Sequence, residues 1–149
     1  MTLVMSSDNG VVSPQAGAVI QTRRLERKGR PLRVVIAEDE SLVVLDIQNM
    51  IQDAGGEVVG IAVRGQDAIT LAAALRPDVV LMDVHLMGDM DGIEAARAIR
   101  ALKGVAVLFV TAHGDVDTLR RMFEVVPISP IIKPISEAQL REMIMRVCL

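Results

Sequence analysis

The sequence VVLMDVHL (Val79–Leu86) decides the fold of this chain. Four apolar residues run without a break into an acid, Asp83. An uninterrupted apolar run of this length is typical of a strand buried on both faces, as in a parallel sheet covered by helices. Ligands of such sheets bind just beyond the carboxyl ends of the strands, which is where Asp83 is expected. The alternative is that Asp83 only ends a strand and binds nothing. The residues that follow the other predicted strands distinguish these two interpretations.

Short β-branched runs alternate with amphipathic segments on either side of this stretch. Strands are expected at 32–37, 57–62, 78–82, 105–110 and 128–132, and helices at 41–54, 66–75, 93–102, 115–124 and 137–147. This alternation predicts an α/β fold, a three-layer (βα)5 sandwich with a parallel sheet between two layers of helices. Pro130 falls within the last predicted strand. Because proline cannot donate to a sheet ladder, that strand is expected at an edge.

The length of 149 residues suits one domain. No apolar run approaches the roughly 18 residues that span a bilayer, and the N-terminus lacks a signal-peptide pattern. The single cysteine, Cys148, excludes an internal disulfide and suits a reducing compartment. We therefore expect a cytoplasmic location and no membrane partner.

The net charge of −3 is unevenly distributed along the chain. Residues 1–31 hold five basic and two acidic side chains and carry +3, so residues 32–149 carry −6. Contacts with nucleic-acid phosphates need clustered Lys and Arg, so the acidic body argues against nucleic acid as a direct partner. Residues 1–31 show no sustained hydrophobic period and are expected to form a mobile N-terminal tail, followed by the domain at 32–149.

Polar and charged residues follow four of the five predicted strands. They are Glu38 and Asp39 after the first, Asp83 after the third, Thr111 after the fourth and Lys133 after the fifth. Three carboxylates in one crevice repel each other and favour a hard divalent cation such as Mg²⁺ among them. A lysine and a hydroxyl suit the oxygens of a phosphoryl group. The pattern therefore predicts an aspartate that accepts a phosphoryl group while a metal ion and a lysine neutralise the charge.

The motifs at these positions resemble the receiver domain of two-component response regulators. They are VVIAEDE (34–40), VVLMDVHL (79–86) with MDGIEA (90–95), VLFVTA (107–112) and IIKP (131–134). Each motif is weak alone, but four of them in this order are highly specific, and the resemblance covers about residues 32–147. It implies a flavodoxin-like sheet with strand order 2-1-3-4-5.

The resemblance also implies a role for each residue of the predicted site. Asp83 would be the phosphoacceptor, Thr111 a switch hydroxyl and Lys133 the partner of the phosphoryl group, with a cis bond between Lys133 and the next proline. The ligands of Mg²⁺ would be Glu38, Asp39, Asp83 and the backbone carbonyl of His85. The phosphoryl donor would be a phosphohistidine on a sensor histidine kinase or on a histidine phosphotransfer protein.

The sequence departs from the family pattern in ways that bear on the switch. Glu38 stands where the family more often has Asp, and Pro130 occupies a position where a switching Tyr or Phe is common. Coupled threonine–aromatic switching is therefore not expected. His85 and His113 each lie two residues beyond a site residue. They are either solvent-exposed loop residues or groups that tune the attack of water on the acyl phosphate.

The leading interpretation is a single-domain response regulator that catalyses only its own phosphorylation and dephosphorylation. Its output would come from a downstream protein bound at the face of the fourth helix, fifth strand and fifth helix, or from passing on the phosphoryl group. A homodimer is a further possible assembly. The alternatives are a non-phosphorylated interaction module, or a receiver cut from a longer regulator with a DNA-binding or enzymatic output domain. A haloacid-dehalogenase-type phosphatase would need a second acid where this sequence has His85.

Overall fold

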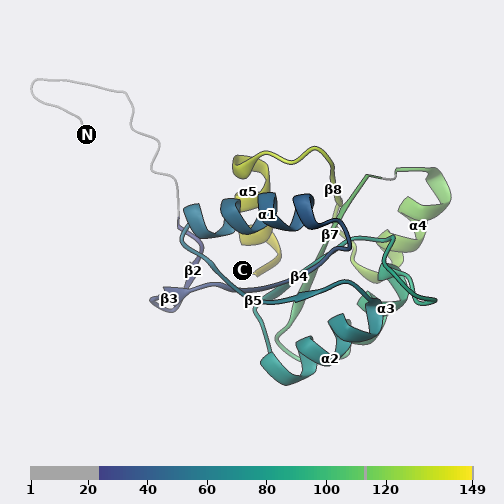
Figure 1. Ribbon diagram of the computed structural model, residues 1–149, viewed down its shortest axis with the longest axis horizontal. Coiled ribbons are helices and arrows are strands. Elements are labelled where there is room, and N and C mark those ends of the chain that lie inside the picture. Colours follow the sequence, from purple (N-terminus) through teal and green to yellow (C-terminus); the bar gives the residue numbers. More distant parts are fainter. Residues whose placement is uncertain (1–23, 113, 149) are drawn as a thin grey trace, which may run out of the picture.

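The computed structural model describes residues 24–112 and 114–148 and shows one parallel sheet between two layers of helices (Figure 1). The strands of this sheet are β4 (Arg33–Ala37), β5 (Glu57–Ala62), β6 (Val79–Met82), β7 (Ala106–Thr111) and β8 (Ile131–Ile132). The helices are α1 (Ser41–Asp53), α2 (Gly65–Leu75), α3 (Gly92–Arg100), α4 (Val116–Val125) and α5 (Glu137–Cys148). Within the described residues, no helix is both long enough and apolar enough to cross a membrane.

The strands follow the order β5-β4-β6-β7-β8, and each neighbouring pair is parallel. Counted along the chain, this is the order 2-1-3-4-5, so the predicted flavodoxin-like fold is confirmed. Ala37 at the end of β4 is level with Met82 at the end of β6, and Met82 is level with Phe109 in β7. The residues just beyond these strands therefore meet at one edge of the sheet.

Strand β6 shows why the deciding stretch is apolar throughout. Val79, Val80, Leu81 and Met82 are all buried. Val80 and Met82 point into the core layer shared with α2 and α3, whereas Val79 and Leu81 point into the layer shared with α1 and α5. Since both faces of the strand are covered by helices, no position along it favours a polar side chain.

Strand β8 is shorter than predicted. The sequence suggests a strand over 128–132, but β8 covers only Ile131–Ile132, and Pro130 lies just before it. The strand is nevertheless at the edge of the sheet, beside β7. Its predicted position is confirmed, but for a different reason, because the proline precedes the ladder and does not interrupt it.

Residues 24–31 pack against the domain, although the sequence analysis placed them in a mobile tail. Strands β2 (Glu26–Arg27) and β3 (Arg30–Pro31) pair as an antiparallel hairpin. Leu25 is buried, and its N–H donates to the carbonyl of Ala54 beyond the end of α1, at 2.8 Å. These contacts correct the predicted boundary at residue 31. Residues 1–23, the rest of the predicted tail, lie outside the described residues.

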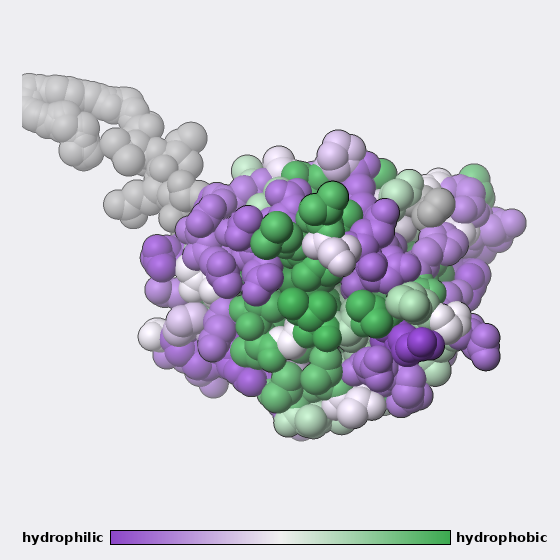
Figure 2. All heavy atoms as spheres, viewed as in Figure 1, coloured by the Kyte–Doolittle hydropathy of each residue, from purple (hydrophilic) through white to green (hydrophobic). Residues whose placement is uncertain are grey.

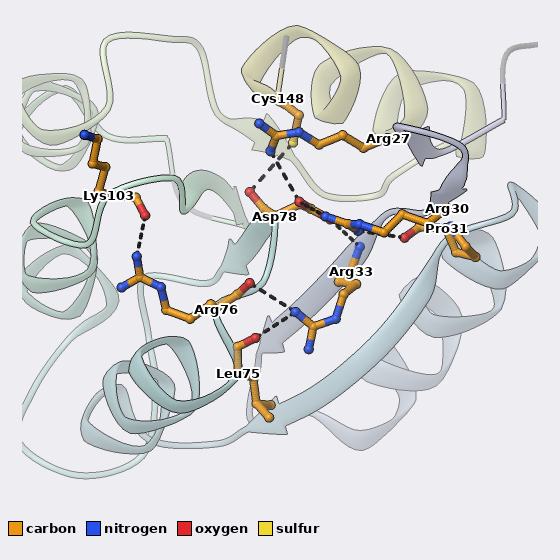
Figure 3. A network of polar contacts seen from close by, with 9 residues as sticks. All are labelled: Arg27, Arg30, Pro31, Arg33, Leu75, Arg76, Asp78, Lys103 and Cys148. Atoms are coloured by element: carbon orange, nitrogen blue, oxygen red, sulfur yellow. Dashed lines mark hydrogen bonds and ion pairs between the residues drawn. The ribbon is translucent and has the colours of Figure 1, made fainter.

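Asp78, just before β6, anchors this hairpin (Figure 3). Its carboxylate accepts hydrogen bonds from the guanidinium groups of Arg30 (2.9 and 3.0 Å) and Arg27 (3.3 Å), and from the backbone N–H of Arg33 (2.8 Å). Burial would by itself raise the pKa of Asp78, but the hydrogen bonds from Arg30 and Arg33 and the charges of the arginines lower it below its usual value. The ionised carboxylate thus holds the hairpin on the domain.

We expect Asp78→Asn to lower the free energy of unfolding by about 2 kcal/mol, because a charged acceptor of several hydrogen bonds becomes a neutral amide. Denaturant unfolding at neutral pH measures this loss. The pKa of Asp78 is lower in the folded protein than in the unfolded chain. Its contribution is therefore present above the unfolded pKa and lost as the pH falls through the folded pKa, so the difference between wild type and variant should close in acid. Asp53→Asn, at an exposed position of α1, is the control; an equal loss in both variants would contradict the anchoring role.

Candidate functional site

The ends of β4, β6, β7 and β8 bring the predicted site residues to one edge of the sheet. The N–H of Glu38 donates to β5 and the N–H of Asp83 donates to β4, at 2.9 and 3.0 Å, so both acids extend the ladder just past their own strands. The N–H of Lys133 donates to the carbonyl of Thr111 at 2.9 Å and joins the ends of β8 and β7 in the same way. Backbone pairing, more than any local motif, fixes where these side chains start.

Lys133 lies between two buried carboxylates. Its Nζ is 2.6 Å from Oε1 of Glu38 and 3.0 Å from Oδ2 of Asp83. Glu38 is 2% exposed and Asp83 is 7% exposed. The other carboxylate oxygen of Asp83, Oδ1, accepts a hydrogen bond from the N–H of Val84 at 2.7 Å. Because buried charges are costly unless they are paired, the ammonium group is what allows the two carboxylates to share this space.

The pKa values of the group reflect this crowding. Burial raises the pKa of Glu38 to about 7, although the hydrogen bond from Lys133 acts in the opposite direction, and the charge of Asp83 adds to the rise. Burial alone would lower the pKa of Lys133, but its hydrogen bonds to Glu38 and Asp83 raise it. The lysine therefore stays a cation. Another positive charge at the site would favour the ionised form of Glu38.

A third carboxylate gives the site the donors that a metal ion needs. One oxygen each of Glu38, Asp39 and Asp83 lie within 4.8 Å of one another. Oxygen donors at this spacing fit a hard divalent cation that keeps water on its remaining positions. The charge also fits, because these three carboxylates outnumber the one ammonium group that lies beside Glu38 and Asp83. The structure thus brings together the three side chains that the sequence analysis named as metal ligands.

Of the remaining predicted residues, Thr111 and His85 have a described position in the fold. Thr111 is buried at the end of β7, where the ladder aligns it with Ile132 of β8. His85 is exposed in the loop after Asp83, and His113 lies outside the described residues. The peptide bond between Lys133 and Pro134 is cis, as the family resemblance implies. The roles of Thr111 and of the two histidines stay predictions.

The loop after Asp83 is held by a close backbone approach. The N–H of Gly92, the first residue of α3, donates to the carbonyl of Val84 at 2.7 Å. A Cβ atom at Gly92 would overlap the backbone carbonyl oxygen of Asp83. Only glycine leaves room for this contact, so the start of α3 helps to set the position of Asp83.

Helix α3 begins with a capping box that the sequence analysis missed. The side chain of Asp91 accepts from the N–H of Glu94 (2.8 Å), and the side chain of Glu94 accepts from the N–H of Asp91 (2.9 Å). Asp91 also pairs with Arg121 of α4 at 2.9 Å. The spacing of an acid and a glutamate three residues apart was readable in the sequence, whereas the contact with α4 was not.

The family model for the response regulator receiver domain matches residues 34–145, and the chain belongs to this family. The transcriptional regulatory protein PdtaR of Mycobacterium tuberculosis is 38% identical over 110 residues, which cover 74% of this chain and 53% of PdtaR. A protein-glutamate methylesterase/protein-glutamine glutaminase of Geobacter sulfurreducens is 38% identical over 88 residues, 58% of this chain and 24% of that protein. The chain thus spans about half the length of PdtaR and less of the methylesterase.

A solved structure supports the same conclusion. The signal receiver domain of a modulated diguanylate cyclase from Desulfovibrio desulfuricans G20 superposes with a TM-score of 0.74 and 30% sequence identity, over 79% of this chain and 94% of that one. The assignment to the receiver family is confirmed, and with it a role in two-component signalling. Receiver domains act with histidine kinases or phosphotransfer proteins and with output partners. The relatives join their receivers to different activities, so the family alone does not specify an output.

We expect Gly92→Ala to lower the free energy of unfolding by about 2 kcal/mol, because the added methyl group would push the start of α3 away from the carbonyl of Asp83. Denaturant unfolding measures the loss. Gly114→Ala is the matched control, since its added Cβ would lie 3.8 Å from the nearest atom, in Ile132. A Gly92→Ala variant as stable as wild type would show that the loop is not constrained in this way.

Proposed function

We propose that Asp83 accepts a phosphoryl group from a phosphohistidine on a sensor histidine kinase or a histidine phosphotransfer protein, in a reaction that requires Mg²⁺. The observation that carries the proposal is the position of Lys133, whose Nζ lies 3.0 Å from a carboxylate oxygen of Asp83. A carboxylate can act as a nucleophile toward phosphorus only where cations offset the charge that gathers around it. Lys133 and the neighbouring acidic cluster supply one such cation and the ligands for a second.

The chemistry is a transfer between two nucleophiles. A carboxylate oxygen of Asp83 attacks phosphorus, the bond from phosphorus to the histidine nitrogen of the donor breaks, and its electron pair stays on the departing imidazole. When bound, Mg²⁺ supplies charge neutralisation for the phosphoryl oxygens. Its proposed ligands are Glu38, Asp39, Asp83 and the backbone carbonyl of His85. Lys133 would turn from Glu38 to the new phosphoryl group, and Thr111 would donate its hydroxyl to it.

The proposed output surface is the face formed by α4, β8 and α5. Three large apolar side chains are exposed on α4 and β8: Val116 (71%), Phe123 (57%) and Ile132 (42%). A cavity of about 470 Å³ lies among Val116, Phe123 and Pro130. Exposed apolar side chains beside a cavity fit a protein partner, either a downstream protein or a second copy of the chain. A movement of Thr111 would reach this face through Ile132 of β8, with which Thr111 is level in the sheet.

The proposed setting is the cytoplasm, where a free thiol such as that of Cys148 stays reduced.

We also propose that the chain acts only on its own phosphorylation and dephosphorylation. His85 is exposed close to Asp83, where it would orient or block the water that hydrolyses the acyl phosphate. A comparison of acyl phosphate lifetimes in wild type and His85→Ala tests that role, and equal lifetimes would refute it.

We expect wild-type protein incubated with Mg²⁺ and acetyl phosphate to gain the mass of one phosphate, and Asp83→Asn to gain none, because the amide is not a nucleophile toward phosphorus. Intact mass spectrometry measures the adduct. Asp89→Asn is the matched control, because it removes an exposed acid from the same loop and should leave the adduct intact. If wild type forms no adduct with acetyl phosphate or any kinase donor, the chain is better described as a non-phosphorylated interaction module.

We expect Lys133→Met to make the stability of the protein depend on Mg²⁺, because Glu38 and Asp83 lose the cation that separates their charges. Thermal unfolding with EDTA and with Mg²⁺ measures this. The melting temperature of the variant should fall below that of wild type in EDTA and rise more on addition of Mg²⁺. Lys103→Met, at an exposed position, is the control. An equal effect of Mg²⁺ on wild type and Lys133→Met would contradict the proposed charge balance.

A further inference from the structure

A cluster of basic residues gathers at the amino end of the sheet, the end opposite to Asp83. It consists of Arg27, Arg30, Arg33, Arg76, Arg100 and Lys103, here named the amino-end basic cluster. Figure 3 shows Arg27, Arg30 and Arg33 hydrogen-bonded to Asp78, and Arg76 hydrogen-bonded to the carbonyl of Lys103. Arg33 donates to the carbonyls of Leu75 (2.7 Å) and Arg76 (3.1 Å), and Arg76 donates to the carbonyl of Lys103 (2.7 Å). These contacts connect the start of β4 with the end of α2, and the end of α2 with the segment after α3.

The cluster carries far more positive than negative charge. Asp78 is the only acid that forms ion pairs with it in the described part of the chain, and it pairs with Arg27 and Arg30. Arg33, Arg76, Arg100 and Lys103 form no ion pair within the described residues, although Glu57 is level with Arg33 on β5, so the cluster keeps an excess of positive charge. Like charges gathered at one end of the sheet repel each other, and a bound anion would relieve that repulsion. The excess is notable because the whole chain has a net charge of −3.

A cavity of about 220 Å³ opens into the cluster between the ends of α3 and α5. Arg27 and Arg100 line it, together with Gly104 and Cys148. Since one water molecule needs only about 10–15 Å³ of such space, the cavity is large enough for a phosphate group. Asp78 also lines the cavity. Its carboxylate is already bound by Arg27, Arg30 and a backbone N–H, so its charge is compensated.

The hydrogen bonds within the cluster leave donors for a ligand. The carboxyl ends of helices carry partial negative charge that would repel an anion. Arg33 binds carbonyls at the end of α2, and Arg76 binds the carbonyl of Lys103 beyond the end of α3, so these groups are already satisfied. A guanidinium group has five N–H donors in a planar fork that matches phosphate oxygens. Arg100 and Lys103, both exposed, have no ion pair within the described residues.

We propose that the amino-end basic cluster binds an anion that carries at least two phosphate groups. One phosphate would occupy the cavity between Arg27 and Arg100, and the next would lie against Arg76 and Lys103. The proposal does not depend on phosphorylation of Asp83, because the two sites lie at opposite ends of the sheet. It revises the expectation drawn from net charge, since the packed hairpin adds its arginines to the domain. A free polyphosphate and a nucleic-acid backbone both offer the required groups.

Calorimetric titration with pyrophosphate, at low ionic strength and without Mg²⁺, tests the site in the full chain. The test variant is Arg100→Glu with Lys103→Glu. The matched control is Arg64→Glu with Arg120→Glu, which reverses two exposed charges outside the cluster and changes the net charge equally. We expect the test variant to bind about tenfold more weakly than wild type, because charge-assisted hydrogen bonds are lost, and the control to bind within about twofold.

The same proteins titrated with a single-stranded RNA oligonucleotide identify the source of the phosphates. Tighter binding of RNA than of pyrophosphate, with a steep dependence on salt, would support the site and assign it to a nucleic-acid backbone. Binding of pyrophosphate alone would support the site and assign it to a free anion. Failure of wild type to bind either probe, or an equal loss in the test and control variants, would overturn the proposal.

Discussion

The pairing of Lys133 with Glu38 and Asp83 is the interaction on which the site depends. Two carboxylates buried this deeply would repel each other strongly if no cation lay between them. With Asp39 included, the site has more negative than positive charge, and this excess favours the binding of a divalent cation. Under the proposed function, the same imbalance would prepare Asp83 for phosphoryl transfer, because Lys133 offsets the charge that the reaction gathers there.

The fold separates the charges of the domain between its two ends. The acids of the candidate site meet where the strands end, whereas the arginines of the hairpin, β4 and α2 meet where the strands begin. Around the centre of the view, apolar side chains form a band across the surface near β5 (Figure 2). Ile61 of β5, a strand at the edge of the sheet, is 45% exposed. The domain thus has an acidic end, a basic end and an apolar side.

Much of this arrangement was readable in the sequence, because it follows from local patterns. The alternation of strands and helices predicted the sheet, and the order of the motifs placed Asp83, Thr111 and Lys133 at its edge. The packing of residues 24–31 was not readable. It depends on ion pairs to Asp78 from residues 48 and 51 positions away, and periodicity carries no information about such contacts. The 2.6 Å contact of Lys133 with Glu38 could not be predicted from the sequence either. The sequence patterns predicted only that Lys133 would contact a phosphoryl group on Asp83.

The central claim is that Lys133 and a bound divalent cation together offset the negative charges of Glu38, Asp39 and Asp83. A crystal structure of the protein grown with Mg²⁺ and beryllium fluoride, a stable analogue of the acyl phosphate, tests it most directly. The account predicts a metal ion among Glu38, Asp39 and Asp83, beryllium fluoride bonded to the Asp83 carboxylate, and the Nζ of Lys133 moved from Glu38 to a fluorine. Beryllium fluoride absent from Asp83, or a Lys133 that keeps its contact with Glu38 while the metal binds elsewhere, would contradict it.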